Sequence, residues 1–173
     1  MSSSLVSEAE GPLLLVTGRH FGRSGLRGIM PVMQELAAGA KREIQVLAYV
    51  MTESARPLLG MIEQALERGV HVTIVLNVIP GQPPALHSDL RRLASFGHAR
   101  IRYFADSEGS QLHAKALIAD REFAVLGSAN YTWGGLVSNH ELGVLLKGRA
   151  AWELGELADR LVAVSEAESE LTG

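Results

Sequence analysis

Hydrophobic positions in the first two thirds of the chain follow two alternating patterns. Short runs rich in valine, isoleucine and leucine are typical of buried strands, and they alternate with stretches in which apolar residues recur at helical spacing. The runs predict strands at 13–17, 44–50, 70–78 and 99–104, and the spacings predict helices at 26–40, 53–69 and 88–96. This alternation of strands and helices indicates an α/β fold.

The pattern changes after residue 112. Short connections join the next strands, as in hairpins, so these strands are expected to run antiparallel to their neighbours. They are predicted at 114–119, 123–126 and 142–146. A last amphipathic helix is predicted at about 149–164, and its Trp152 is expected to pack in the core or at a dimer interface.

Together these elements predict an α/β/α sandwich, in which helices flank a mixed central sheet. We expect one folded domain over 11–165, preceded by a flexible N-terminus at 1–10 and followed by an acidic tail at 166–173. The length of 173 residues, with 47% hydrophobic and 20% charged residues, fits one globular domain.

Composition removes several classes of chemistry. The chain has no cysteine, which excludes disulfides, thiol catalysis and cysteine-ligated metals. The N-terminal run lacks a basic start, and no apolar run approaches the length of a membrane span, so a cytoplasmic protein is expected.

The charge pattern bears on the partner. A net charge of −3 argues against indiscriminate binding of nucleic acid. Arginines nevertheless gather in the glycine-rich loop 18–25, which lacks the Gly-Lys-Ser/Thr ending of a phosphate-binding P-loop. A plain loop is favoured there, and the alternative is that Arg19 and Arg23 contact a nucleic-acid backbone.

Candidate chemistry is concentrated between Leu112 and Asn130. His113 and Lys115 are two apart on a predicted strand, so their side chains project from the same face. Histidine can act as a nucleophile or proton carrier, and lysine binds phosphate as a point charge. Ser128 and Asn130 follow the next strand and can donate neutral hydrogen bonds. This set indicates a phosphate site, and it is too poor in ligands for a metal cage.

The spacing of these residues resembles the defining motif of the phospholipase D superfamily. The pattern is His113-x-Lys115, then four residues and Asp120, then six residues and Gly-Ser128-x-Asn130. Asn139-His-Glu141 follows where family members carry a glutamate that orients the catalytic histidine. The segment 44–77 is also similar to the small bacterial Nuc-type endonucleases of this superfamily.

The resemblance implies a metal-independent, cofactor-free, two-step displacement through a covalent phosphohistidine. One histidine attacks phosphorus and a second protonates the leaving oxygen. The chain carries a single copy of the motif, so a homodimer that pairs two His113 residues is the simplest solution. In the implied roles Lys115 and Asn130 bind phosphate oxygens, with Ser128 beside them. Asp120 belongs to the motif set and is expected to anchor the strand end rather than react.

Glu141 is implied to bond the remaining ring nitrogen of a His113, of its own subunit or of the partner. Tyr131 and Trp133 follow the motif directly, and stacking on a base or plain packing are equal alternatives for them. Nucleic acid, in particular DNA, is the favoured substrate. The alternatives are a phospholipid or cardiolipin hydrolase, and a non-catalytic nucleic-acid-binding subunit of a restriction or phage-defence system.

Overall fold

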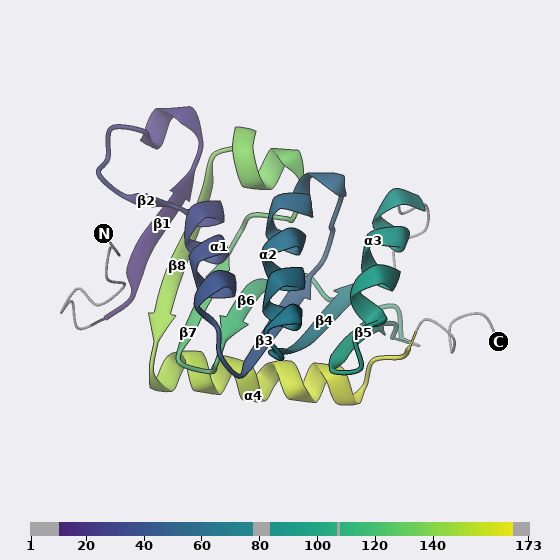
Figure 1. The fold of residues 1–173 in the computed structure, drawn as a ribbon. Helices are drawn as coiled ribbons and strands as arrows, with labels where there is room; N and C mark the ends of the chain where they lie inside the picture. The colour runs from purple at the N-terminus through teal and green to yellow at the C-terminus, as the bar shows by residue number, and fades with distance from the viewer. Residues whose placement is uncertain (1–10, 78–83, 107, 168–173) are drawn as a thin grey trace.

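The computed structural model describes residues 11–77, 84–106 and 108–167. Its centre is an eight-stranded mixed sheet with the order β2-β1-β8-β7-β6-β3-β4-β5 (Figure 1). The strands are β1 (Leu13–Thr17), β2 (Arg27–Gly28), β3 (Glu43–Ala48), β4 (His71–Asn77), β5 (Ala99–Phe104), β6 (Lys115–Ala119), β7 (Phe123–Gly127) and β8 (Glu141–Lys147). The β3–β4–β5 set is parallel, whereas β6 and β8 each run antiparallel to both neighbours. The mixed sheet expected from the two sequence patterns is confirmed.

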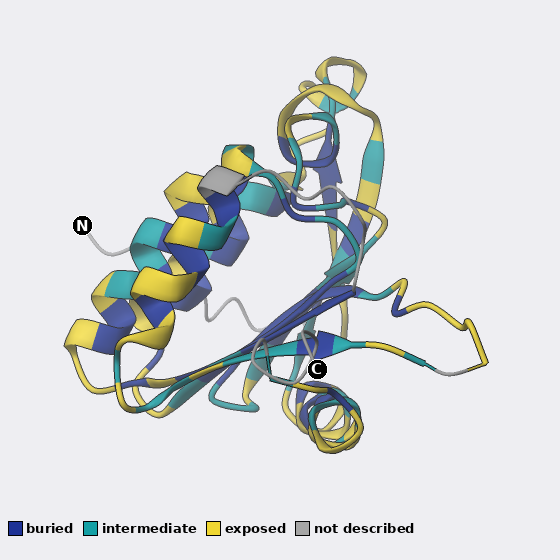
Figure 2. Ribbon diagram, turned by 90° about the vertical axis from the view of Figure 1, so that its right-hand side faces the viewer, coloured by how far each residue is buried: buried dark blue, intermediate teal, exposed yellow. Residues whose placement is uncertain are grey.

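Helices cover both faces of this sheet. The helices α1 (Ile29–Gly39), α2 (Arg56–Glu67) and α3 (Pro84–Ala94) lie on one face, and α4 (Arg149–Ala163) crosses the other alone (Figure 2). The strands between them are largely buried, because each face is packed against helices. The predicted α/β/α sandwich is therefore the observed architecture. No helix among the described residues is long and apolar enough to cross a membrane.

Some element boundaries differ from the prediction. The first helix begins at Ile29 rather than near residue 26, because Arg27 and Gly28 pair with β1 as a short parallel strand. The third helix spans Pro84–Ala94 instead of 88–96. The expected strand 70–78 is observed as far as Asn77, and Val78 lies outside the described residues.

The domain limits are only partly visible. Residues 1–10 and 168–173, where a flexible N-terminus and most of an acidic tail were expected, lie outside the described residues. Glu166, which was assigned to that tail, exchanges two backbone hydrogen bonds with Tyr103 of β5, with N–O distances of 2.7 and 2.8 Å. The chain therefore remains attached to the sheet at least to this residue.

Helix α4 packs through small residues rather than through its large ones. Its buried positions are Ala151, Gly155 and Ala158, while Trp152 and Leu157 are both 51% exposed. A Cβ atom at position 155 would lie 3.1 Å from the Arg121 side chain and 3.2 Å from the Gln45 side chain, so both would have to shift to admit a larger residue. A core position for Trp152 is thus wrong, and a dimer contact stays a prediction.

Ion pairs of Arg121 hold α4 against the sheet. Its guanidinium donates to Glu43 at the start of β3 and to Glu156 and Asp159 on α4, at 2.5–2.6 Å. These carboxylates raise the pKa of Arg121 above its ordinary value, with Glu43 as the largest cause and Asp159 next. The guanidinium of Arg121 therefore joins β3, the β6–β7 turn and α4.

Candidate active site

The predicted site residues meet at one edge of the sheet. Strands β3 and β7 end there and strands β6 and β8 begin there, as their antiparallel registers require. This edge carries His113 and Lys115 at the start of β6, Ser128 and Asn130 after β7, and Glu141 at the start of β8. Sequence positions 28 residues apart are thereby brought onto three neighbouring strands.

Lys115 is the buried cation of the site. Its side chain is buried, and Nζ lies 2.7 Å from His113 Nδ1 and donates to the His113 carbonyl oxygen, also at 2.7 Å. An ammonium has three N–H groups, so one remains for a phosphate oxygen. Burial lowers the pKa of Lys115, and the charge of Glu141 offsets part of this effect.

His113 is held on both sides. Its ring lies against Tyr49, with 4.2 Å between the ring centroids, and Lys115 Nζ lies 5.1 Å from the Tyr49 centroid. Because a lysine ammonium only donates, Nδ1 of His113 accepts in this arrangement, and the proton of the neutral ring is on Nε2. His113 itself is exposed.

Glu141 bonds to neighbours other than His113 in the single chain. Its carboxylate accepts from the hydroxyl of Ser128 and from Asn139 Nδ2, the latter at 3.3 Å. Among the described residues no hydrogen bond joins Glu141 to His113 of the same chain. The orienting role implied by the family resemblance therefore stays a prediction, and the partner subunit's His113 is the alternative that this geometry leaves open.

Asn130 carries an unpaired buried group. Its Oδ1 is buried and has no hydrogen-bond partner among the described residues. Leaving such an acceptor unpaired costs about 1–3 kcal/mol, which is typical of functional sites. A Cβ atom at position 135 would collide with the backbone carbonyl oxygen of Asn130, so the π-helical turn η3 (Gly134–Ser138) approaches Asn130 closely only because it contains glycine.

The two aromatic residues after the motif have different environments. Tyr131 is fully buried and donates its hydroxyl to the Ala116 carbonyl oxygen at 2.7 Å. Stacking of Tyr131 on a base therefore does not fit the structure, and packing is the correct alternative. Trp133 is 62% exposed, and Val137 in the turn that follows it is exposed as well. An exposed apolar rim, which the sequence did not reveal, thus lies at this edge.

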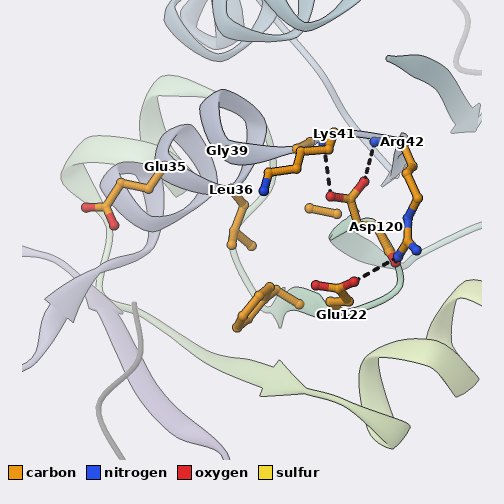
Figure 3. Close-up of a pocket in the computed structure, with 10 residues that line it drawn as sticks. Glu35, Leu36, Gly39, Lys41, Arg42, Asp120 and Glu122 are labelled. Atoms are coloured by element: carbon orange, nitrogen blue, oxygen red, sulfur yellow. Dashed lines mark hydrogen bonds and ion pairs between the residues drawn. The ribbon is translucent and has the colours of Figure 1, made fainter. Parts of the chain in front are cut away.

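Asp120 lies at the other end of β6, away from His113 and Lys115. Its carboxylate accepts from the backbone N–H groups of Lys41, Arg42 and Glu43 at 2.7–3.0 Å and lines a pocket at that edge (Figure 3). Burial pushes the pKa of Asp120 upward, but the three N–H donors and the charge of Arg42 outweigh it, so its pKa lies below its ordinary value. These contacts favour the anchoring role expected for Asp120.

Replacement of Asp120 by asparagine is expected to lower the free energy of unfolding by about 2 kcal/mol, since an amide cannot accept all three N–H bonds. Because the folded pKa is depressed, the Asp120 contribution is full above the unfolded pKa of about 3.9 and disappears as pH falls through the folded pKa. Urea denaturation at pH 7 and at pH 3 measures this, and the two proteins should differ less at pH 3. An equal difference at both values would contradict it.

Two contacts of the site were missed by sequence reasoning. Tyr49 follows β3 and Asn139 precedes β8, and neither belongs to the motif. The position of Tyr49 just after a parallel strand, where binding sites of α/β sheets gather, was the available signal. In the described parts of the chain, no three histidine or acidic side chains are grouped as a metal site would need.

Comparison with known proteins assigns the family. Residues 33–163 match the family described as cardiolipin synthase, PLD-like domain. The matched segment reaches from α1 to the end of α4. The chain belongs to the phospholipase D superfamily, as the motif had indicated.

Three individual proteins are similar. The DISARM protein DrmC of Bacillus paralicheniformis is 31% identical over 124 residues, which are 71% of this chain and 51% of that protein. The chain thus spans about half the length of this relative. The structure of Nuc, a phospholipase D family member from Salmonella typhimurium, matches with a TM-score of 0.71 at 23% identity, over 91% of this chain and 98% of Nuc. NucT from Helicobacter pylori matches with a TM-score of 0.70 at 15% identity, over 91% and 98%.

Proposed function

We propose that the protein is an endonuclease that cleaves nucleic-acid phosphodiester bonds, most readily in DNA, without a metal ion. The observation that carries this proposal is the meeting of His113, Lys115 and Asn130 at one exposed edge, with the cationic loop 18–25 at the same edge. Arg19 and Arg23 of this loop are exposed, as expected for contacts with a phosphate backbone.

In the proposed first step, Nε2 of one His113 attacks phosphorus, a P–N bond forms, and the P–O bond to the leaving group breaks. Attack requires the ring proton to lie on Nδ1, so Nδ1 must exchange its contact with Lys115 for a carboxylate acceptor, for which Glu141 is the candidate. The freed ammonium of Lys115 and the amide of Asn130 then bind the nonbridging oxygens.

A second imidazole has to protonate the leaving oxygen, and the partner subunit's His113 would supply it. Water then attacks phosphorus and gives its proton to the partner subunit's imidazole, which lost one in the first step, while the P–N bond breaks and the His113 nucleophile is regenerated. Each chain has one motif, so the proposal includes a twofold homodimer with a shared site. The exposure of His113 in the single chain supports this arrangement, because it leaves the ring open to a second subunit.

A phospholipid hydrolase is the second candidate. The exposed side chains of Trp133 and Val137, in the segment that joins Asn130 to Glu141, favour it, since an apolar rim could contact lipid chains. The same side chains could instead be covered by a second subunit. The cationic loop has no corresponding use on a single lipid headgroup, and it makes nucleic acid the favoured substrate.

A role in a restriction or phage-defence assembly, expected from the sequence, remains part of the proposal. It is supported by the similar protein that is named a DISARM protein. A cytoplasmic location likewise stays a prediction.

The test compares substrates under metal-free conditions. The purified protein is treated with EDTA and incubated separately with plasmid DNA, single-stranded oligonucleotides, RNA and vesicles of phosphatidylglycerol and cardiolipin. We expect DNA cleavage that resists the chelator. Lipid turnover without cleavage of nucleic acid would establish the second candidate instead, and binding of DNA without turnover would favour an accessory subunit.

The dimer is tested in the same preparation. Mass by light scattering and specific activity are measured over a dilution series, and both should fall together as the dimer dissociates. A monomer that retains full specific activity would rule out the shared site.

A further inference from the structure

The loop that follows β1, residues 18–25, is cationic and has no carboxylate of its own. We call it the cationic loop. Its Arg19 and Arg23 are exposed, and no ion pair is recorded for either within the described parts of the chain. Arg27, just beyond the loop, differs because it pairs with Glu35 at 2.5 Å. The charges of Arg19 and Arg23 are therefore available to an anion.

The cationic loop is held in place by contacts with the segment that leads into β8. His20 Nδ1 and His140 Nε2 lie 2.5 Å apart, and their rings stack with 4.7 Å between centroids. Phe21 meets the His140 ring edge-on at 5.5 Å. Gly18 has a φ of 116° and a Cβ there would lie 2.7 Å from the Asn139 carbonyl oxygen, so only glycine permits this approach. The loop therefore presents its cations from a fixed position.

This position is too far from His113 for one phosphodiester group to reach both. The loop follows β1, and His113 precedes β6, three strands away in the order β1-β8-β7-β6. At about 4.8 Å between neighbouring strands, β1 and β6 lie about 14 Å apart across the sheet. A nucleic-acid strand with about 3.4 Å of rise per nucleotide covers that distance in about four nucleotides.

We propose that the cationic loop, together with His140, forms a second phosphate subsite, which binds the backbone of a nucleic-acid strand about four nucleotides from the bond cleaved at His113. This inference rests on the proposed nuclease function. It assigns His20 and His140 to substrate binding and gives Arg19 and Arg23 a place along the strand. A substrate that ends close to the scissile phosphate gains nothing from the subsite.

The experiment compares a long and a short substrate. kcat/KM is measured for a single-stranded octanucleotide and for bis(p-nitrophenyl) phosphate, with wild type, His20→Ala and the double variant Arg19→Ala/Arg23→Ala. Arg100→Ala is the matched control, because Arg100 is an exposed arginine on the edge strand β5, at the far side of the sheet. The ratio of the two kcat/KM values should fall about tenfold in the double variant and less in His20→Ala.

Salt dependence adds a second readout. For the double variant, the slope of log Kd against log salt for the octanucleotide should decrease by about 0.7 for each lost contact. A ratio and slope equal to those of wild type would overturn the inference, and so would an equal loss in Arg100→Ala.

Failure of the proposed function is distinguishable from failure of the subsite. If the wild type cleaves neither substrate, the nuclease proposal fails. Fluorescence anisotropy of a labelled octanucleotide, with the loop variants built on His113→Ala, then still decides the subsite. Binding weakened about tenfold by the double variant supports it, and unchanged binding overturns it.

Discussion

Replacement of His113 by alanine is expected to lower kcat for phosphodiester cleavage by about 10³-fold or more, because the variant loses the group proposed to form the covalent intermediate. The fold should persist, since His113 is exposed and precedes β6 rather than packing in the sheet. Circular dichroism and a steady-state assay on plasmid DNA measure the two effects.

His71→Ala is the matched control for that variant. His71 is also exposed and stands at the start of β4, at the opposite edge of the sheet. Its replacement should change kcat less than twofold, because substitutions at surface positions away from a functional site usually have small effects. A His113→Ala protein that keeps a tenth of wild-type activity would place the nucleophile elsewhere. Rapid quenching of the wild type with a radiolabelled substrate should in turn trap phosphate on the protein and not on the variant.

Replacement of Lys115 by methionine is expected to lower kcat/KM by about 10²–10³-fold, the usual loss when one donor to a developing oxyanion is removed. Methionine is an unbranched apolar side chain about one atom shorter than lysine, and it removes the charge. Stability should not fall in parallel, because the variant no longer buries an ammonium. Kinetics and urea denaturation of the same sample separate the two effects, and Lys41→Met, at an exposed lysine of the opposite edge, is the control.

The pH dependence of kcat/KM tests the protonation of Lys115. Burial lowers its pKa, so the ammonium loses its proton below the ordinary lysine value of about 10.4. Wild-type kcat/KM should therefore decline on the alkaline side before that pH, and the residual activity of Lys115→Met should lack this decline. A profile with the same alkaline limb in both proteins would assign the limb to another group.

Much of the site was predictable because its information is local. The period of two along a strand placed His113 and Lys115 on one face, and their 2.7 Å contact in the structure agrees with that placement. The spacing of the motif identified the family, and the matching residues 33–163 confirm it. The order of strands and helices also followed from periodicity, with errors of a few residues where Arg27 and Gly28 joined β1.

Other features depended on which distant segments pack together, and no local pattern encodes that. For Tyr131 the sequence left stacking on a base and packing as alternatives. In the structure its hydroxyl donates to the Ala116 carbonyl oxygen in the core. Trp152 was expected in the core or at a dimer interface, but α4 packs on the sheet through Ala151, Gly155 and Ala158, and Trp152 is 51% exposed.

The sequence by itself determined the reacting groups, their spacing and the alternation of elements, since each depends on residues close together in the chain. The tertiary structure alone decided that Asp120 lies at the opposite edge from His113, that the Tyr49 ring lies against the His113 ring, and that His20 pairs with His140. The physical reason is the strand order of the sheet. It sets the distances between residues up to 120 positions apart, and those distances separate the scissile site from the second phosphate subsite that we propose.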